Sequence, residues 1–376
     1  MAGMIDSTYR MVVMQPTNYC NANCSYCYLP NRRDTAHMQP AVAQAIARDI
    51  EEQGEPVTVL WHSGEPTSVG TRVMRQLLDP FENGRGQGLV RHHIQTNATL
   101  IGDGWCRLFD EYAFEIGVSL DGPAWLCTER VNWAGRPIHA QAVEGIRRLM
   151  DAGLNPYAIC VVPPSSTGRG VELLTYFDDL GLEAVAFNLE ASLGISTTRS
   201  VPADEAARRF WTDVLTWCRA HPDRIRVREL LQAAAFVQRT MDKPREPMPT
   251  VGRDGTVVLA SPELAGLRAP VYNDFRAGNV LEEPLTAIIG RQHELGYIAE
   301  FEKGLEACRA TCGFWEFCHG GFAAMRYAEH GRMDTTRTQW CTAARIELAR
   351  ALADQLDGDT TSRTAQAFIP LMERTS

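Results

Sequence analysis

The nine residues CNANCSYCY, at positions 20–28, place three cysteines at spacings of four and three among polar residues and tyrosines. The chain has 11 cysteines in 376 residues. A triplet at one specified spacing is roughly a one-in-a-hundred event by chance. This stretch therefore indicates a ligand set.

Three thiolates suit some metal groups and not others. Structural zinc takes four ligands, and Cys20, Cys24 and Cys27 have no obvious fourth partner nearby in the sequence. A cubane iron–sulfur cluster held by three thiolates keeps one iron open to a small molecule. The triplet therefore predicts chemistry at a cluster.

The composition restricts the class of protein. The chain is 45% hydrophobic with a net charge of −9, and its basic residues are scattered along the sequence. No apolar run reaches the roughly 18 residues that a membrane span needs, and no signal peptide is evident. We expect a cytoplasmic protein with reduced cysteines, no membrane and no nucleic-acid partner. The acidic balance permits a cationic partner such as a basic peptide.

Strand-like and helix-like segments alternate from residue 11 to about residue 220. Six such repeats predict an α/β fold with a parallel sheet, either an open doubly wound sheet or a partial barrel. The expected strands are 11–16, 57–61, 90–96, 114–120, 157–162 and 184–189, and the expected helices include 41–53, 139–153, 171–181 and 203–221.

A change in composition near residue 240 predicts the domain organisation. Residues 231–250 include MDKPREPMP and read as a linker after a first domain over 1–230. A cysteine-rich domain is expected over 251–357, with a final helix from about residue 337. The remaining segment, 358–376, is rich in Thr, Ser and Asp and is expected to fray.

Unusual residues follow each expected strand. Because ligands of parallel α/β folds lie at the carboxyl ends of the strands, these tips predict one shared active site. They are the cysteine loop, WHSGEP at 61–66, QTN at 95–97, SLDGP at 119–123, VVPPSS at 161–166 and FNLE at 187–190.

The cysteine loop resembles the CxxxCxxC signature of the radical S-adenosylmethionine (SAM) enzymes, including the aromatic Tyr26 before the last cysteine. The resemblance implies a partial (β/α)6 TIM barrel. It also implies that Cys20, Cys24 and Cys27 hold a 4Fe-4S cluster whose open iron chelates SAM. Reductive cleavage of SAM then gives a 5′-deoxyadenosyl radical, with electrons from a donor such as flavodoxin or ferredoxin.

A second motif, SGEP, resembles the superfamily's GGEP and comprises Ser63, Gly64, Glu65 and Pro66. The resemblance implies that the backbone and Glu65 hold the amino group of SAM. Ser63 departs from the usual glycine.

Further contacts follow from the same resemblance. Asn97 and Ser119 are implied to contact the ribose and carboxylate of SAM, and Val161 to lie against the adenine. Arg130 is a candidate carboxylate clamp, because a guanidinium pairs with a carboxylate in two places. Read alone, each of these residues could equally be a strand-end turn or a surface arginine.

A second set of cysteines lies in the C-terminal part of the chain. Read alone, the four thiolates of this set could hold a zinc ion. In a chain with the implied radical SAM barrel, however, these cysteines resemble the ligands of the outer cluster in a SPASM domain. A SPASM domain usually holds two auxiliary clusters. Ala260, Ser261 and Phe322 stand where cysteines of the inner cluster are expected, so the resemblance implies one auxiliary 4Fe-4S cluster. Its implied ligands are Cys308, Cys312, Cys318 and Cys341.

Longer phrases, among them VLWHSGEP and CRATCGFWEFCHGG, resemble the cyclophane-forming SPASM maturases of glycine-rich-repeat precursor peptides, the GRRM/OscB type. This implies a ribosomal precursor peptide as substrate and a carbon–carbon crosslink between a β-carbon and an aromatic ring. The segments 128–137 and HGGF depart from that family's usual pattern.

The crosslink needs a proton acceptor, and Asp121 and Glu190 are candidates because a carboxylate in a dry pocket can have a raised pKa. Other radical reactions remain open: epimerisation, thioether formation or side-chain oxidation. Epimerisation would need a cysteine near the site, such as Cys127 or Cys160. A non-enzymatic alternative is a zinc-binding interaction protein.

Overall fold

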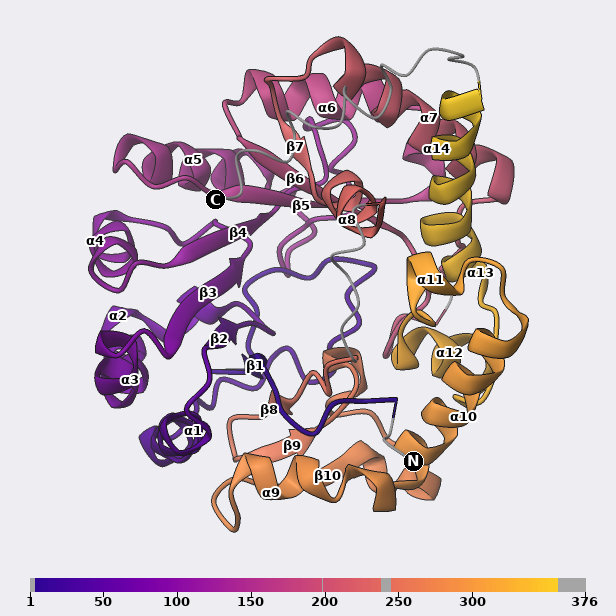
Figure 1. The fold of residues 1–376 in the computed structure, drawn as a ribbon. Coiled ribbons are helices and arrows are strands. Elements are labelled where there is room, and N and C mark those ends of the chain that lie inside the picture. Colours follow the sequence, from indigo (N-terminus) through magenta and orange to yellow (C-terminus); the bar gives the residue numbers. More distant parts are fainter. Residues whose placement is uncertain (1–3, 198, 238–244, 358–376) are drawn as a thin grey trace.

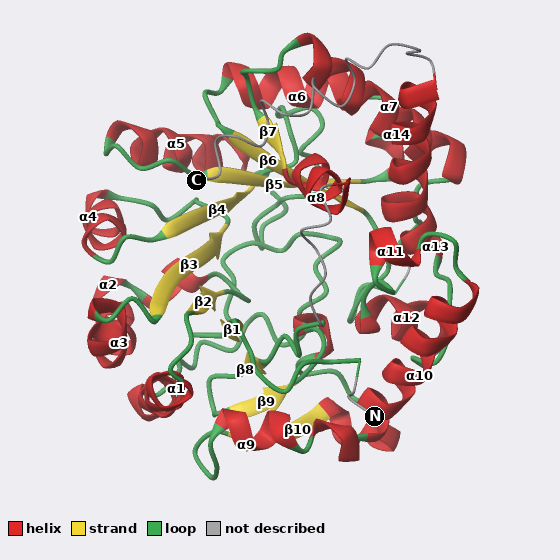
Figure 2. Ribbon diagram, viewed as in Figure 1, coloured by secondary structure: helices red, strands yellow, loops and turns green. Residues whose placement is uncertain are grey.

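One ten-stranded sheet organises the molecule (Figure 1). The computed structural model describes residues 4–197, 199–237 and 245–357. The sheet order is β10-β9-β8-β1-β2-β3-β4-β5-β6-β7, and the strands follow a curve around the interior (Figure 2). The expected tail, 358–376, lies outside the described residues, as does part of the expected linker.

The first six strands confirm the predicted α/β fold with a mostly parallel sheet. Neighbouring strands pair in parallel from β1 to β7. β2, β3, β5 and β6 have the predicted bounds, and β1 and β4 are slightly shorter. The strands are β1 Met11–Met14, β2 Val57–Trp61, β3 Val90–Thr96, β4 Glu115–Ser119, β5 Tyr157–Val162, β6 Ala184–Leu189 and β7 Arg226–Val227.

Helices pack on the outer face of this sheet (Figure 1). Each presents an apolar stripe inward: α1, for example, buries Val42, Ile46 and Ile50. The outer helices are α1 Pro40–Gln53, α2 Thr71–Leu78, α3 Glu82–Gly86, α4 Asp103–Glu111, α5 His139–Asp151, α6 Gly170–Asp179 and α7 Asp204–Ala220.

The sheet continues into the C-terminal part of the chain. β8 (Thr250–Val251) pairs in parallel with β1, and β9 (Thr256–Val258) and β10 (Arg276–Asn279) extend it in antiparallel fashion. The sheet does not close, because β10 and β7 lie at its two ends. Helix α8 (Arg228–Val237) occupies the start of the segment that the sequence predicted to be a linker.

Of the remaining helices, α10 to α14 lie on the side opposite α1–α4, whereas α9 packs against α1 (Figure 1). The predicted helix from residue 337 is interrupted by a π-helical turn, Thr342–Ile346. Trp211 on α7 donates to the Ala343 carbonyl at 2.9 Å, which fixes this turn to the first part of the chain. These helices are α9 Leu285–Gly290, α10 Gly296–Thr311, α11 Trp315–Cys318, α12 Ala323–His330, α13 Gln339–Cys341 and α14 Glu347–Asp357.

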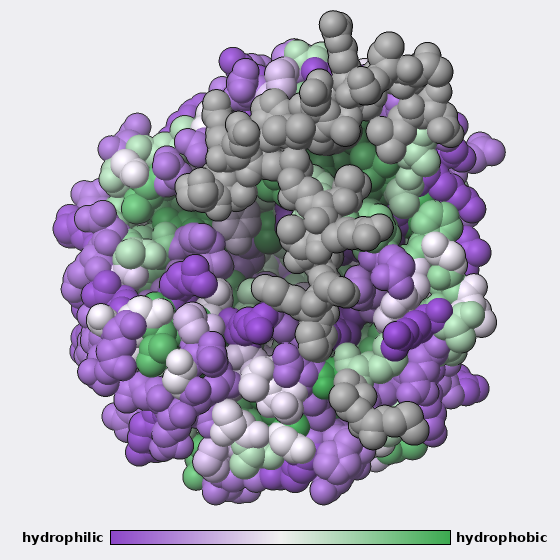
Figure 3. All heavy atoms as spheres, in the orientation of Figure 1, coloured by the Kyte–Doolittle hydropathy of each residue, from purple (hydrophilic) through white to green (hydrophobic). Residues whose placement is uncertain are grey.

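Hydrophilic residues predominate over the part of the face in Figure 3 that grey atoms leave visible, with hydrophobic residues in smaller patches. Among the described residues, no helix combines the length and apolar character needed to cross a bilayer.

Candidate active site

The cysteine loop follows β1 and is fixed from several sides. The Cys20 amide donates to the Arg32 carbonyl at 3.0 Å, and the Asn23 amide donates to the Val131 carbonyl at 2.7 Å. The indole of Trp133 donates to the Cys20 carbonyl at 2.8 Å. The loop is therefore held both by the residues that follow it and by a segment more than 100 residues away.

The three thiols of this loop share one small apolar cluster: Cys24 is buried with Ala22 and Ile138, and Cys20 and Cys27 pack against it. Burial raises the pKa of the Cys20 thiol to about 12, and burial also raises the pKa of Cys24. Buried thiols ionise only beside a compensating positive charge, which iron supplies. The donor set thus fits an iron–sulfur cluster.

Gly64 allows the SGEP tip to press against the cysteine loop. Its φ is +58°, and a Cβ added there would lie 2.5 Å from the Tyr19 carbonyl oxygen. The neighbouring Glu65 amide donates to that same oxygen at 2.7 Å. Ser63 also has a left-handed backbone, with φ +79°, and its hydroxyl accepts from Gln15 at 2.9 Å. A side chain at position 64 would separate the two tips.

Glu65 is a buried carboxylate held by several donors. Its Oε1 accepts from the Thr67 hydroxyl and the Thr96 hydroxyl, each at 2.6 Å, and its Oε2 accepts from the Asn97 amide at 2.7 Å. Burial raises the pKa of Glu65, while these hydrogen bonds lower it. Among the described residues, Oε2 accepts from the Asn97 amide alone, which leaves a lone pair for a ligand ammonium group. Pro66 begins the following 3₁₀ turn.

Asn97 joins the end of β3 to the cysteine loop. Its Nδ2 donates to Asn21 Oδ1 at 2.9 Å and lies 4.0 Å from the Cys20 sulfur. The Thr99 hydroxyl donates to Asn97 Oδ1 at 2.7 Å. Asn97 is therefore positioned beside the first cysteine.

Asp121 lies at the centre of a buried group that sequence reasoning did not anticipate. Its carboxylate accepts from the Tyr26 hydroxyl at 2.5 Å, from Arg130 Nε at 2.9 Å and from the Val161 amide at 3.0 Å. The Arg130 guanidinium also lies over the Tyr26 ring, 5.4 Å from its centroid. We call Tyr26, Asp121 and Arg130 the Asp121 triad.

The triad changes the interpretation of two predicted site residues. A carboxylate that already accepts from three donors is poorly placed to take a proton from a substrate, so the geometry favours a positioning role for Asp121. Arg130 commits its Nε to Asp121 and is 7% exposed, so only its terminal nitrogens remain for a carboxylate. Ser119 lies nearby on β4 and accepts from Gln95 at 2.8 Å.

Glu190 directly follows β6 and differs from Asp121 in its surroundings. It is 5% exposed, and its Oε1 lies 3.3 Å from an Arg199 nitrogen but accepts no hydrogen bond from the described residues. Burial raises the pKa of Glu190, with Arg199 opposing this effect. A buried carboxylate with an unused oxygen is the better proton acceptor of the two.

The second cysteine set lines a single cavity, together with Phe314, Trp315 and Phe322. The four sulfur ligands come from α10, α11, α13 and the turn between the first two helices. Among the described residues, no three His, Cys, Asp or Glu side chains converge on one metal-ion position. The four cysteines therefore line the cavity without converging on a single metal-ion position. They are Cys308, Cys312, Cys318 and Cys341.

Arg326 lines this cavity, and Arg245 and Arg345 interact electrostatically with Cys318, a feature that sequence reasoning missed. Arg326 is 2% exposed and donates to the Cys308 sulfur at 3.2 Å and to the Gly320 carbonyl at 2.7 Å. Arg245 donates to the His319 carbonyl at 3.1 Å, and burial lowers its pKa to about 10. Burial also lowers the pKa of Arg345, while Cys318 opposes this effect. Positive charge gathered around thiols fits an anionic metal–thiolate cluster.

Ala260, Ser261 and Phe322, which stand where the resemblance implied cysteines of an inner cluster, make contacts within the protein. Ser261 donates its hydroxyl to Glu263, and Ala260 is 5% exposed. Phe322 packs edge-on against Trp340, and the Arg245 guanidinium lies 5.7 Å from the Phe322 centroid.

Comparison with known proteins is consistent with this geometry. Residues 14–176 match the model of the Radical SAM superfamily. The chain is 30% identical to an uncharacterized protein of Synechocystis sp. over 370 residues, which covers 92% of both chains. It is 26% identical to the serine-type anaerobic sulfatase-maturating enzyme of Klebsiella pneumoniae, covering 83% of this chain and 81% of that enzyme.

Two solved structures share the fold. Native anSMEcpe with bound AdoMet has a TM-score of 0.75 at 18% identity, covering 93% of this chain and 98% of the other. Streptococcus suis SuiB bound to precursor peptide SuiA has a TM-score of 0.65 at 18% identity, covering 90% and 76% of the two chains.

Proposed function

The chain belongs to the radical SAM superfamily, and from this premise we propose that it is a maturase that forms a carbon–carbon crosslink in a ribosomally made peptide. Two kinds of relative support a peptide or protein substrate. One is named a sulfatase-maturating enzyme, and the structure of another contains a precursor peptide. We assign residues 1–230 to the radical SAM part and 251–357 to a SPASM-like part.

The first cluster site is assigned to Cys20, Cys24 and Cys27, and SAM to the adjoining motifs. When bound, the cluster and SAM supply a hydrogen-abstracting 5′-deoxyadenosyl radical. We assign Glu65 Oε2 as the acceptor for the SAM ammonium group, and Asn97 is held beside Cys20. Within the Asp121 triad, the Asp121 carboxylate accepts hydrogen bonds from the Tyr26 hydroxyl and the Val161 amide and so holds both groups in position. A reducing partner such as flavodoxin or ferredoxin would supply the electron.

The proposed reaction removes two hydrogens from the peptide. One C–H bond breaks at a side-chain β-carbon, and that carbon then bonds to an aromatic ring carbon. The ring must next release one proton and one electron to regain its aromaticity. We assign the proton to Glu190, whose Oε1 is buried without a hydrogen bond from the described residues.

The observation that carries the proposal is the second cysteine cavity with its arginines. Removal of two hydrogens requires an electron acceptor, and a buried site with Arg326 against the Cys308 sulfur would favour an added negative charge. We assign one auxiliary 4Fe-4S cluster to this cavity. Positive charge at the cavity supports a redox role better than structural zinc.

Epimerisation is less well supported. That reaction needs a thiol to return a hydrogen atom to the substrate, yet Cys127 is 1% exposed and Cys160 is 0% exposed. Burial raises the pKa of both thiols and keeps them protonated, but neither reaches the surface of the site.

Substrate mass tests the proposal. The anaerobically purified protein is incubated with SAM, a chemical reductant and the peptide encoded beside its gene. Crosslinking gives a product lighter by two hydrogens, with fragmentation blocked inside the ring. The matched control replaces Cys20, Cys24 and Cys27 with Ala and should give neither product nor 5′-deoxyadenosine. Product of unchanged mass would indicate epimerisation and contradict crosslinking.

A further inference from the structure

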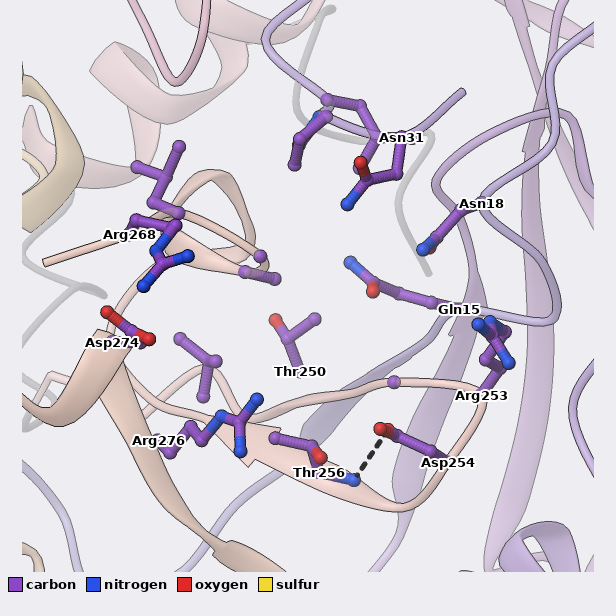
Figure 4. Close-up of a pocket in the computed structure, with 17 residues that line it drawn as sticks. Gln15, Asn18, Asn31, Thr250, Arg253, Asp254, Thr256, Arg268, Asp274 and Arg276 are labelled. Carbon is purple, nitrogen blue, oxygen red and sulfur yellow. Dashed lines mark hydrogen bonds between the residues drawn. The ribbon is translucent and has the colours of Figure 1, made fainter. Parts of the chain in front are cut away.

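A polar pocket separates the cysteine loop from the C-terminal hairpin (Figure 4). It has a volume of about 430 Å³, within the usual range for ligand sites. One wall comes from the segment after β1, and the other from β8, β9 and the residues before β10. Its polar lining residues include Gln15, Asn18, Asn31, Thr250, Arg253 and Arg276.

Two exposed arginines line the pocket. The guanidinium groups of Arg268 and Arg276 face it from the same side (Figure 4), and neither forms a hydrogen bond or ion pair with the described residues. Arg253, by contrast, pairs with Asp34 at 2.5 Å. Two carboxylates also line the pocket (Figure 4): Asp274 accepts from the Ala269 amide at 2.7 Å, and Asp254 accepts from the Thr256 amide at 3.1 Å.

A buried hydroxyl in the same pocket has no partner. Thr250 is 1% exposed, and its Oγ1 forms no hydrogen bond with the described residues. Buried polar groups are normally satisfied, so an orphaned hydroxyl in a cavity wall points to a ligand. This observation is independent of the arginines.

The pocket also communicates with the candidate active site. Gln15 is 4% exposed, lines the pocket, and donates to the Ser63 hydroxyl at 2.9 Å. Leu29, two residues after Cys27, forms part of the same wall. A chain segment held in this pocket would therefore lie next to both the SGEP tip and the cysteine loop.

We propose that this pocket binds an acidic side chain of the peptide substrate, with the carboxylate between Arg268 and Arg276 and with Thr250 Oγ1 hydrogen-bonded to the same segment. The identity of the ligand as a peptide rests on the proposed function. Guanidinium groups pair well with carboxylates, and the volume accommodates a short extended segment.

Fluorescence anisotropy tests the proposal with a fluorescein-labelled peptide that contains five glutamates between glycines. Matched peptides contain five glutamines or five lysines. We expect the glutamate peptide alone to bind, and the Arg268→Ala and Arg276→Ala variants each to bind it roughly three- to ten-fold more weakly. The matched control is the double variant Arg72→Ala/Arg107→Ala on α2 and α4, which removes the same charge outside the pocket and should bind normally.

Thr250→Val provides a second variant. Removing the orphaned hydroxyl should raise the thermal midpoint of the free protein and weaken peptide binding. Equal affinity in the Arg268→Ala/Arg276→Ala double variant would overturn the proposal. Equal binding of all three peptides would overturn it too, as would full displacement by inorganic phosphate at constant ionic strength.

Formation of 5′-deoxyadenosine separates this proposal from the proposed function. The arginine variants should still cleave SAM in the presence of reductant, because Arg268 and Arg276 lie outside the assigned SAM contacts. A wild-type protein that binds the glutamate peptide but never cleaves SAM would contradict the proposed function and leave the pocket assignment standing.

Discussion

The guanidinium of Arg326 lies 3.2 Å from the sulfur of Cys308, and both side chains are buried. A charged hydrogen bond to a cluster ligand stabilises the reduced, more negative state. Because such a bond contributes roughly 1.5–3 kcal/mol, Arg326→Gln should lower the potential of the second cluster by on the order of tens of millivolts.

Redox titration followed by electron paramagnetic resonance measures this shift. The variants are made in a protein in which Cys20, Cys24 and Cys27 are replaced by Ala, so that only the proposed auxiliary cluster contributes to the resonance signal. Arg326→Lys is the matched control, because it keeps the charge and should shift the potential less. An unchanged potential in a fully loaded Arg326→Gln protein would contradict the assigned role.

Cys341 distinguishes a structural from a redox role for the second site. The wild-type protein should contain about eight irons, and the protein with Ala at Cys20, Cys24 and Cys27 about four. Cys341→Ala should still cleave SAM but yield less crosslinked peptide, because the ring cannot lose its electron. Iron analysis, 5′-deoxyadenosine and product mass measure the three quantities. Wild-type crosslinking by a folded Cys341→Ala protein would count against the redox role, and twelve irons against a single auxiliary cluster.

Gly64→Ala should disrupt the first site. The added Cβ would lie 2.5 Å from the Tyr19 carbonyl oxygen, so the SGEP tip and the cysteine loop would have to separate. Gly54→Ala is the control: Gly54 also has a left-handed backbone, at φ +71°, but nothing lies within 4 Å of its added Cβ. The control should lose only about 1–2 kcal/mol of stability. SAM affinity and iron content should fall in Gly64→Ala alone; equal values in both variants would show that the clash is relieved.

Glu190→Gln and Asp121→Asn should impair different properties of the protein. Glu190→Gln removes the proposed proton acceptor, so SAM cleavage should continue while the crosslinked product decreases. Asp121→Asn weakens the contacts to Tyr26 and Arg130, so stability and SAM binding should fall together. Thermal unfolding, SAM binding and the ratio of product to 5′-deoxyadenosine separate the two outcomes. A Glu190→Gln protein with the wild-type ratio would exclude Glu190 as the acceptor.

His92 should make stability depend on pH. It is 1% exposed, accepts from the Trp61 indole at 3.2 Å, and burial lowers its pKa to about 3. Below pH 6.5 the unfolded chain binds a proton that the folded protein excludes, so stability is lost as the pH falls. The loss approaches about 1.4 kcal/mol per pH unit.

Chemical denaturation between pH 7.5 and pH 5 measures this slope. His92→Phe should reduce it by about one proton, whereas His293→Gln, at an exposed histidine, should leave it unchanged. Equal slopes in the wild-type protein and His92→Phe would contradict a neutral buried His92.

The strands of the first half could be predicted because each is a buried run of β-branched or aromatic residues bounded by turns. β2 and β5 were predicted to the residue for this reason. β7 and β8 contain two residues each, too few for any periodicity to be visible. Their positions depend on pairing with strands far away in the sequence.

The candidate site was predictable where a motif is continuous and not where the fold gathers single residues. The cysteine loop and SGEP are local patterns. Arg245 and Arg326 are 81 residues apart, and only the fold brings both close enough to Cys318 to interact with it. Asp121 was predicted as a candidate proton acceptor, because nothing in DGP reveals its contacts to the Tyr26 hydroxyl and the Val161 amide.

The pairing of β8 with β1 makes the two halves of the molecule interdependent. The Val13 amide donates to the Pro249 carbonyl at 2.9 Å, and the Gln15 amide donates to the Val251 carbonyl at 2.9 Å. A chain cut between the halves would leave the strand that carries the cysteine loop as a bare sheet edge, open to pairing with other molecules. The cysteine-rich C-terminal part thus also protects the edge of β1 from pairing with other molecules. Exchange of the C-terminal part between relatives would have to preserve the register of β8 on β1 as well as the set of cysteines.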